Sequence, residues 1–448
     1  MSSPEQCGLS GKLTVVAVYG NPLRDSRGLT SMNGLELPEI LSPCLNSLPT
    51  KLDDRETLIR NRHVDLIVHQ KAVDTLKARS AIIRHIRDFL LDDNFMEVQT
   101  PILADKAGGA IAKPFATSAT EFPEKELALR VAPELWLKRL IIGGMDRVFE
   151  IGPAFRNEGL DATHNPEFTT CEFYKSYAEL EELIEMTESM LHGLVTKLST
   201  LKAWPLQTLE LPDTAMFDAP FKRIAFIPGV EAGLGCELPD LSSDDAEDKL
   251  IALFKEKDLA LPTSTTLPRL LDKLASIYIE PQCDFPTFIT HHPACMAPLS
   301  KSFLCTQTQQ LISARAELFI GKREIANMYE EENSPFAQRE KFLQQGKWKD
   351  DENKAIVDES YLEALEWGLP PTGGWGAGID RLVMLFTGAK RISDVLSFGS
   401  LKNVVNLGAA GTDKLKIKVR KEKVEEEEVT VDDTKEEVAA DDTKEKVL

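Results

Sequence analysis

Between residues 76 and 91, apolar side chains recur at helical spacing among charged ones. This pattern predicts an amphipathic helix whose apolar stripe packs on the rest of the protein. A strand is expected over residues 95–100 and should stop at Pro101. A second helix, rich in Glu, is expected over residues 178–197. The stripe of the first helix consists of Ile82, Ile83, Ile86, Phe89 and Leu90.

Residues 148–155 and 168–174 each have the pattern of a strand, and a polar loop over residues 157–166 separates them. Together they predict an antiparallel hairpin. If Arg156 points into a cleft, the side chains of Phe168, Glu172 and Tyr174 can line the same face. An arginine able to bind phosphate, an aromatic ring and a buried carboxylate indicate a nucleotide beside a cationic ligand. The alternative is a surface hairpin with solvated charges. The combined spacing of these four residues in the predicted hairpin disfavours that alternative.

A second polar cluster contains Glu317 and Glu324, with Gly321-Lys322 as a hairpin turn between them. Such a turn would bring both carboxylates to one site. Paired carboxylates beside a triphosphate are a common way to hold Mg²⁺. An ordinary acidic surface is the alternative. Three further polar side chains follow in the same cluster: Asn327, Tyr329 and Glu331.

A third cluster runs from Gly373 to Arg381 and leads into the apolar residues 382–386. It predicts a Gly-rich turn before a buried helix, with Arg381 at the mouth of a site, because glycine allows close approach of backbone to ligand. Neither GxGxxG after a strand nor GxxxxGK[ST] occurs, so dinucleotide-binding and P-loop sites are not expected. Two weaker features are a loop at Gly108-Gly109 and the carboxylate of Glu134, which could meet an ammonium group.

Three regions differ in composition. Residues 1–50 are β-prone and turn-rich, with strands expected over 13–18 and 35–37 and turns at 21–22 and 27–28, too little for a complete barrel. Residues 51–402 read as one large domain, with an irregular insertion over 199–268 that is rich in Pro and acidic residues. Residues 403–448 form a charged tail that is expected to be disordered.

Composition sets limits on partners and compartment. The 448 residues carry a net charge of −20, and residues 421–448 alone hold 12 acidic and 5 basic side chains. Any RNA contact therefore needs a local basic patch. Seven cysteines without a CxxC pair suit reduced thiols in an intracellular protein. The sequence has no run near the roughly 20 apolar residues of a membrane span, and its first ten residues show no transit peptide.

Taken in order, the three clusters resemble the three motifs of class II aminoacyl-tRNA synthetases. The elements HNPEF and REIAN-x-Y-x-E are similar to those of lysyl-tRNA synthetases, and the resemblance covers residues 41–402. The segments SATEFP, GPAFRNEGLDATHNPEF and GGWGAGIDR are most similar to the fungal mitochondrial branch. This resemblance implies an α+β fold, in which an antiparallel β-sheet is flanked by helices, after the remnant of an N-terminal OB barrel.

The resemblance also implies roles for individual residues. Arg156 and Arg381 are the catalytic arginines, and Phe168 and Arg381 would sandwich adenine. Glu317 and Glu324 would hold Mg²⁺. The amino end of lysine would meet Glu134 and Gly109, and its ε-ammonium would meet Glu172 and Glu331. The complete ATP set is Arg156, Asn157, Glu158, His164, Asn165, Phe168, Glu324, Ile325, Gly378, Ile379, Asp380 and Arg381; the lysine set is Gly109, Glu134, Arg156, Glu172, Tyr174, Asn327, Tyr329 and Glu331.

The function implied is a lysine–tRNA ligase that uses ATP to make lysyl-adenylate and transfers lysine to tRNA(Lys). A homodimer through the helix before Pro101 and a mitochondrial location are also implied, with the cytoplasm as the alternative. Anticodon contacts are in doubt, because residues 1–50 resemble only the last strands of the family's OB barrel. Two alternatives follow: a paralogue that transfers lysine to another acceptor, and a non-catalytic scaffold. The intact pocket residues disfavour the scaffold.

Overall fold

The structure is a computed structural model that describes residues 15–24, 26, 28–44, 52–105, 108–109, 112–347 and 357–405. The charged segment from residue 406 onward, which includes the acidic tract predicted to be disordered, lies outside the described residues. Among those described, every helix is too short or too polar to cross a lipid bilayer.

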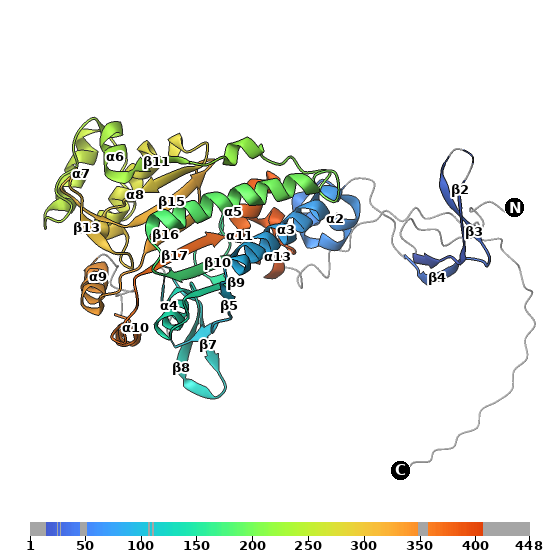
Figure 1. Cartoon of the computed structure of the whole chain (residues 1–448), viewed down its shortest axis with the longest axis horizontal. Helices are drawn as coiled ribbons and strands as arrows, with labels where there is room; N and C mark the ends of the chain where they lie inside the picture. Colours follow the sequence, from blue (N-terminus) through green and yellow to red (C-terminus); the bar gives the residue numbers. More distant parts are fainter. Residues whose placement is uncertain are drawn as a thin grey trace, which may run out of the picture. The chain divides into compact units, whose positions relative to one another are not determined.

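An eight-stranded sheet organises the large domain (Figure 1). Its strand order is β11, β12, β15, β16, β17, β10, β9, β5. The inner pairs are antiparallel, as expected, whereas the outermost pairs β11–β12 and β9–β5 are parallel. The strands are β5 Met96–Glu97, β9 Arg147–Phe155, β10 Glu167–Ser176, β11 Lys222–Ala225, β12 Thr287–Thr290, β15 Arg315–Ile320, β16 Arg323–Glu330 and β17 Thr372–Gly378.

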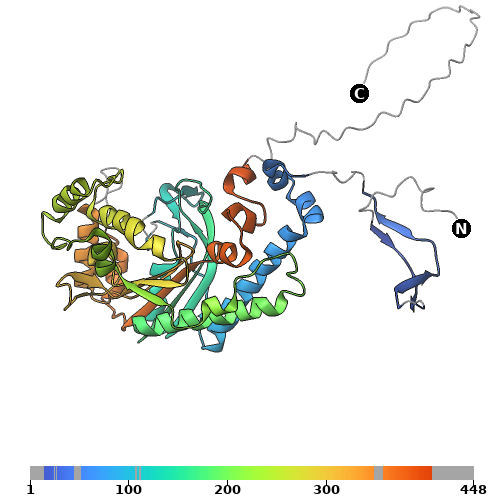
Figure 2. The same ribbon diagram turned by 90° about the horizontal axis from the view of Figure 1, so that it is seen from above.

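Three helices cover one face of this sheet and enclose the main core with it. They are α3 Gln70–Asp92, α5 Leu180–Leu201 and α11 Ile379–Thr387. Figures 1 and 2 show α3 and α5 lying side by side. Phe173 of β10 stacks on Trp375 of β17, with 5.0 Å between ring centroids, at the centre of this core. The predicted amphipathic helix is therefore confirmed, and its buried stripe, which includes Ile82, Ile86 and Leu90, faces the sheet.

Helix α4 Glu134–Ile142 and helix α10 Glu359–Leu365 pack against the opposite face through a second apolar cluster. The remaining helices are α1 Arg55–Arg60, α2 Arg62–Val68, α9 Pro335–Lys347, α12 Ile392–Val395 and α13 Leu401–Val405. Short 3₁₀ turns occupy Thr214–Phe217, Glu280–Gln282 and Ala294–Met296.

The segment 199–268, expected to be irregular, contributes helices. It contains α6 Phe226–Leu234 and α7 Ala246–Glu256, and α8 Leu267–Tyr278 begins at its end. These helices share an apolar cluster of their own. In α7 the buried residues Leu250, Leu253 and Phe254 have helical spacing, but the helix is short and its neighbours are Pro-rich and acidic. The local sequence of α7 does not determine its conformation, and packing of α7 against α8 stabilises the helix.

The N-terminal strands form two small antiparallel pairs, β1 Val15–Ala17 with β4 Glu39–Ser42 and β2 Gly20–Arg24 with β3 Thr30–Gly34. The prediction of a strand over residues 35–37 is wrong, because the described chain has no strand there. The prediction of a turn at 21–22 is also wrong, because both residues lie within β2. Their identity as an OB-barrel remnant stays a prediction. A three-stranded sheet has the order β6 Leu103–Ala104, β8 Phe122–Leu129, β7 Ala116–Ala119. A two-stranded sheet pairs β13 Ser302–Leu304 with β14 Leu311–Ser313.

Candidate active site

The inner strands of the large sheet bring the predicted site residues onto one face. In the strand register, Glu172 of β10 lies opposite Gly376 of β17, which lies opposite Asn327 of β16. Side chains alternate along a strand, so residues two positions away share this face. The face consequently carries Phe168, Glu172 and Tyr174 from β10, Gly374, Gly376 and Gly378 from β17, Asn327 and Tyr329 from β16, and Arg315 and Glu317 from β15.

The glycine-rich segment before α11 is a central strand rather than the predicted turn, whereas the buried helix that follows it is confirmed. Its glycines leave room for side chains of neighbouring strands. A Cβ at Gly374 would lie 2.0 Å from Oε1 of Glu331 and 2.7 Å from Cε1 of Tyr174. Any larger residue at this position would displace one of these groups, so glycine is required for packing the site rather than for a turn.

Beneath that glycine lies a buried lysine. Lys138 of α4 has no exposed side-chain surface, and its Nζ lies 2.6 Å from Oε1 of Glu134 and in closer contact with Oε2 of Glu331. The rings of Tyr174, Tyr329 and Tyr361 surround the ammonium, with centroids 5.7–5.9 Å from Nζ. Burial acts to lower the pKa of Lys138, but the charges of Glu134 and Glu331 outweigh it and raise that pKa.

Lys138 and Tyr361 are absent from the residues predicted above. The four-residue spacing of Glu134 and Lys138 on one helix is the sequence signal that could have identified the lysine. No comparable local signal marks Tyr361, which α10 brings in from far along the chain.

Glu172 and Glu331 converge on this part of the face. The hydroxyl of Tyr174 donates a hydrogen bond of 3.4 Å to Oε2 of Glu172. Burial raises the pKa of Glu331 and Lys138 opposes this, while the nearby charge of Glu172 adds to the rise. Burial, together with Glu134, also raises the pKa of Glu172 to about 8, against the lowering effect of Arg156. A cation placed between Glu172 and Glu331 would relieve both shifts.

Arg156 lies directly after β9, at the rim of the same face. Its guanidinium carbon is 5.1 Å from the ring centroid of Phe168, and its Nε–H donates to the carbonyl of Val131 at 3.4 Å. The arginine predicted to hold the α-phosphate and the aromatic residue predicted to hold adenine therefore touch each other. Arg156 also acts electrostatically on Glu172.

At the outer end of the face, Arg381 joins two elements. Its guanidinium donates to the carbonyl of Glu324 at 3.0 Å and to the Oε2 of that residue at 3.2 Å, and lies 3.0 Å from Nε2 of His164. His164 is held in turn by Asp161, whose Oδ2 is 2.7 Å from Nδ1. Phe168 packs against Arg156, and the adenine sandwich between Phe168 and Arg381 stays a prediction.

The carboxylates of Glu317 and Glu324 belong to a hairpin whose turn is at Gly321-Lys322, as predicted; both turn residues have positive φ, 59° and 61°. Arg315 and His292 contact Glu317, the latter at 3.2 Å, and although burial opposes them they lower its pKa to about 2. Burial and the charge of Glu317 raise the pKa of Glu324. A divalent cation beside the ionised Glu317 would favour the ionised form of Glu324 as well, so the pair suits such an ion.

The described residues contain no group of three or more His, Cys, Asp or Glu side chains placed to bind a metal. Mg²⁺ at this pair would therefore take its other oxygen ligands from phosphate or water, which is the usual arrangement for this ion.

Several other predicted ATP residues already have partners in the fold. Asn165 donates to the carbonyl of Glu167 at 2.6 Å and accepts from the N–H of Leu401 at 3.0 Å. Asp380 is buried and accepts from Arg79 and from the N–H of Thr169. The side chains of Ile325 and Ile379 belong to the main core. Asn157 and Glu158 are exposed at the start of the polar loop. Their predicted contacts with ATP stay predictions.

Gly109 lies on the other side of Glu134. It has a φ of 91°, and a Cβ there would be 3.1 Å from the Cβ of Glu134 and 3.6 Å from its Oε2. Glycine thus allows the loop at 108–109 to approach the carboxylate predicted to bind the amino group of lysine.

Comparison with known proteins agrees with this geometry. The family tRNA synthetases class II (D, K and N) matches residues 54–402. A Schizosaccharomyces pombe protein named "Lysine--tRNA ligase, mitochondrial" is 45% identical over 396 residues, covering 86% of this chain and 72% of that protein. An Encephalitozoon cuniculi protein named "Probable lysine--tRNA ligase, cytoplasmic" is 42% identical, covering 87% and 78% of the two chains. The chain belongs to the class II tRNA synthetases.

A bacterial relative extends the likeness. A "Lysine--tRNA ligase" of Streptococcus agalactiae is 38% identical over 394 residues, covering 86% of this chain and 77% of that protein. The fold class and the family inferred from the sequence motifs are thereby confirmed.

Proposed function

We propose that this protein is an ATP-dependent lysine–tRNA ligase. The observation that carries the proposal is the convergence of Glu172 and Glu331 beside Tyr174, on the sheet face that ends at Arg156. A neutral side chain would leave Oε1 of Glu331, and the part of Glu172 that Tyr174 does not cover, without a cationic partner in a buried site, which is unfavourable. The names of the relatives agree with lysine as the amino acid.

In the first step, the carboxylate of lysine attacks the α-phosphorus of ATP, and the bond to the leaving pyrophosphate breaks. No covalent enzyme intermediate is needed, so the protein contributes positioning and charge neutralisation. Arg156 would hold the α-phosphate and the lysine carboxylate together. Arg381 would hold the adenine end, and Glu317 with Glu324 would hold Mg²⁺, which neutralises charge on the phosphates when bound.

In the second step, the terminal ribose hydroxyl of tRNA(Lys) takes lysine from the adenylate and AMP leaves. We propose that this protein contacts the acceptor end of the tRNA. We propose no contact between strands β1 to β4 and the anticodon.

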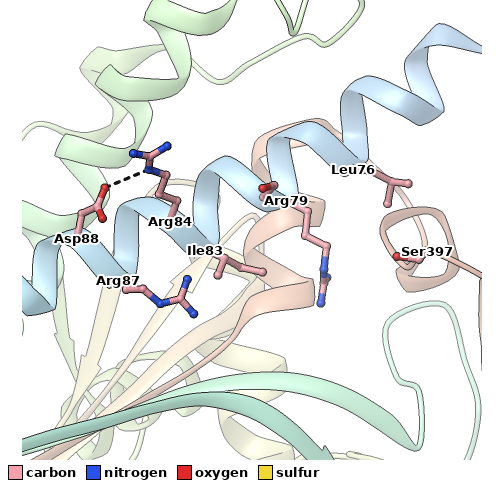
Figure 3. A pocket seen from close by; sticks show the side chains of 8 residues that line it. Leu76, Arg79, Ile83, Arg84, Arg87, Asp88 and Ser397 are labelled. Atoms are coloured by element: carbon pink, nitrogen blue, oxygen red, sulfur yellow. Dashed lines mark ion pairs between the residues drawn. The ribbon is translucent and has the colours of Figure 1, made fainter. Parts of the chain in front are cut away.

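We also infer a homodimer. Strand β5 is an edge strand, and large apolar side chains around it are exposed: Leu91, Met96, Ile102 and Leu103. A hollow on the adjoining helix α3 is lined by Leu76, Arg79, Ser80, Ile83, Arg84, Arg87, Asp88 and Ser397 (Figure 3). A second copy that covers this edge would bury the apolar groups and protect the strand. Sedimentation of the protein in solution measures this state.

The compartment stays a prediction. A mitochondrial location follows from the sequence resemblance, but relatives of similar identity have names that place them in mitochondria and in the cytoplasm alike.

Lysine-dependent exchange between ATP and pyrophosphate tests the first step. We expect robust exchange with lysine and Mg²⁺ and none with methionine or leucine, because the buried carboxylates require a cationic side chain. Aminoacylation of purified tRNA(Lys) then tests the second step. Folded protein that shows no exchange would contradict the proposal, and exchange without aminoacylation would favour a different acceptor.

A further inference from the structure

Lys138 is a fully buried charge in the candidate site, and the chemistry proposed above does not use it. It lies one helical turn after Glu134 on α4, with 0% of its side chain exposed. Burying an ammonium costs several kcal/mol, roughly, unless carboxylates and hydrogen bonds offset it. Here two carboxylates and three tyrosine rings surround it.

The two carboxylates around Lys138 share a pattern. Oε1 of Glu134 accepts from Lys138 at 2.6 Å and from the hydroxyl of Tyr329 at 2.7 Å, whereas its Oε2 lies toward Gly109. Oε2 of Glu331 forms an ion pair with Lys138, whereas its Oε1 lies over Gly374; neither oxygen accepts a hydrogen bond from another described residue. Each carboxylate therefore turns one oxygen to Lys138 and keeps the other for a different partner.

We propose that Lys138 is a positioning residue for lysine recognition, which anchors one oxygen each of Glu134 and Glu331 and leaves the second oxygen of each to the two amino groups of the substrate. The inference rests on the proposed function and deepens it. A lysine ligand brings two ammonium groups, and the site holds two oriented carboxylates, with Glu172 and Tyr174 beside the second.

The surroundings explain why the anchor must be a cation. Among the described residues, the titratable groups in contact with Lys138 are acids: Glu134 from α4, Glu331 after β16, and the tyrosines Tyr174 from β10, Tyr329 from β16 and Tyr361 from α10. Lys138 opposes the effect of burial on Glu331. Without Lys138 the pKa of Glu331 would rise further, because the cation that favours its ionised form would be gone.

The test compares wild-type protein with Lys138→Met, which keeps the length of the side chain and removes its charge. Exchange kinetics are measured from pH 6.5 to 9 with lysine and ATP varied separately. We expect the KM for lysine to rise by about 10- to 100-fold at pH 7, as for loss of one charged hydrogen bond, while the KM for ATP stays within about twofold. The lysine KM is expected to fall as the pH rises, and this fall should occur at higher pH in Lys138→Met than in the wild type.

Arg139→Met is the matched control. Arg139 follows Lys138 on the same helix, but it donates to the hydroxyl of Ser360 at 2.6 Å and stacks on Trp136. Its removal should leave the lysine KM and the pH profile unchanged.

The double variant Lys138→Met/Glu331→Gln separates positioning from stability. Its lysine KM is compared with that of Glu331→Gln alone, because Glu331 is itself proposed to bind the ε-ammonium, and thermal melting is measured for every variant. Positioning predicts that Lys138→Met raises the lysine KM more in the wild-type background than in the Glu331→Gln background. Equal effects of Lys138→Met in both backgrounds, with a matching loss of thermal stability, would overturn the inference.

The outcomes also separate this inference from the proposed function. Wild-type protein without lysine-dependent exchange would refute the function. Wild-type exchange together with an unchanged lysine KM and pH profile in Lys138→Met would refute the role of Lys138 alone.

Discussion

The inner and outer ends of the candidate site differ in how completely the fold prepares them. At the inner end, Lys138 and Glu331 have no exposed side-chain surface, and Gly374 packs against Glu331. At the outer end, the side chains of His164 and Asp161 are 53% and 58% exposed, and Arg381 and Glu324 are 28% and 40% exposed. The inner end can select a ligand by shape and charge, whereas outer groups can exchange partners when a nucleotide binds.

The difference follows from the elements that carry each end. Inner residues come from central strands and from α4, where neighbours on several sides define each rotamer. His164 belongs to the loop between β9 and β10, whose contacts with Arg381 and Asp161 are polar and accessible to water. Preorganisation of a dry pocket gives specificity, and a set of exposed charged groups suits a large, highly charged substrate.

Gly374→Ala should have the largest effect of the changes that test this contrast. The added Cβ would lie 2.0 Å from Oε1 of Glu331, and overpacking of this kind costs about 1–3 kcal/mol. We expect the KM for lysine to rise by roughly 10- to 100-fold in exchange assays. Gly376→Ala, whose Cβ would be 3.4 Å from Cγ of Glu172, should have the smaller effect. A Gly374→Ala variant with wild-type lysine KM would show that the inner end is not tightly packed.

Lysine binding should depend on pH through Glu172. The raised pKa of about 8 means that this carboxyl group is mainly protonated at pH 7 in the free protein. An ammonium ligand favours the carboxylate, so binding releases a proton below pH 8, and affinity rises with pH by at most about tenfold per unit before it levels off. Isothermal titration calorimetry in two buffers measures the released proton.

Glu172→Gln provides the control for this pH dependence. It should bind lysine more weakly, and the part of the pH dependence near pH 8 should disappear. An unchanged profile would assign the titration to another group.

His164→Ala should have the smallest effect. Its side chain is half exposed, and exposed charged contacts contribute about 0.2–1 kcal/mol. We expect the KM for ATP to rise by no more than about fivefold, with the KM for lysine unchanged. A larger effect on lysine than on ATP in the same exchange assay would contradict the separation of the two ends.

Local patterns determined much of this protein in advance. The helix α3, the hairpin of β9 and β10 and the turn at Gly321-Lys322 follow from apolar periodicity and turn chemistry within short segments. The three motifs, in order, also determined the family.

Tertiary structure alone decided the rest. Segment 372–378 forms a central strand, and its glycine at 374 makes room for Glu331 and Tyr174. Turn and strand propensities within the segment do not indicate that these distant side chains require the space. Residues 226–278 form helices because they pack on one another. Lys138 meets Glu331 across nearly 200 positions of sequence, through the order of strands in the sheet. Contacts between distant segments have no periodic signature, so the charge that orients the pocket is visible only in the fold.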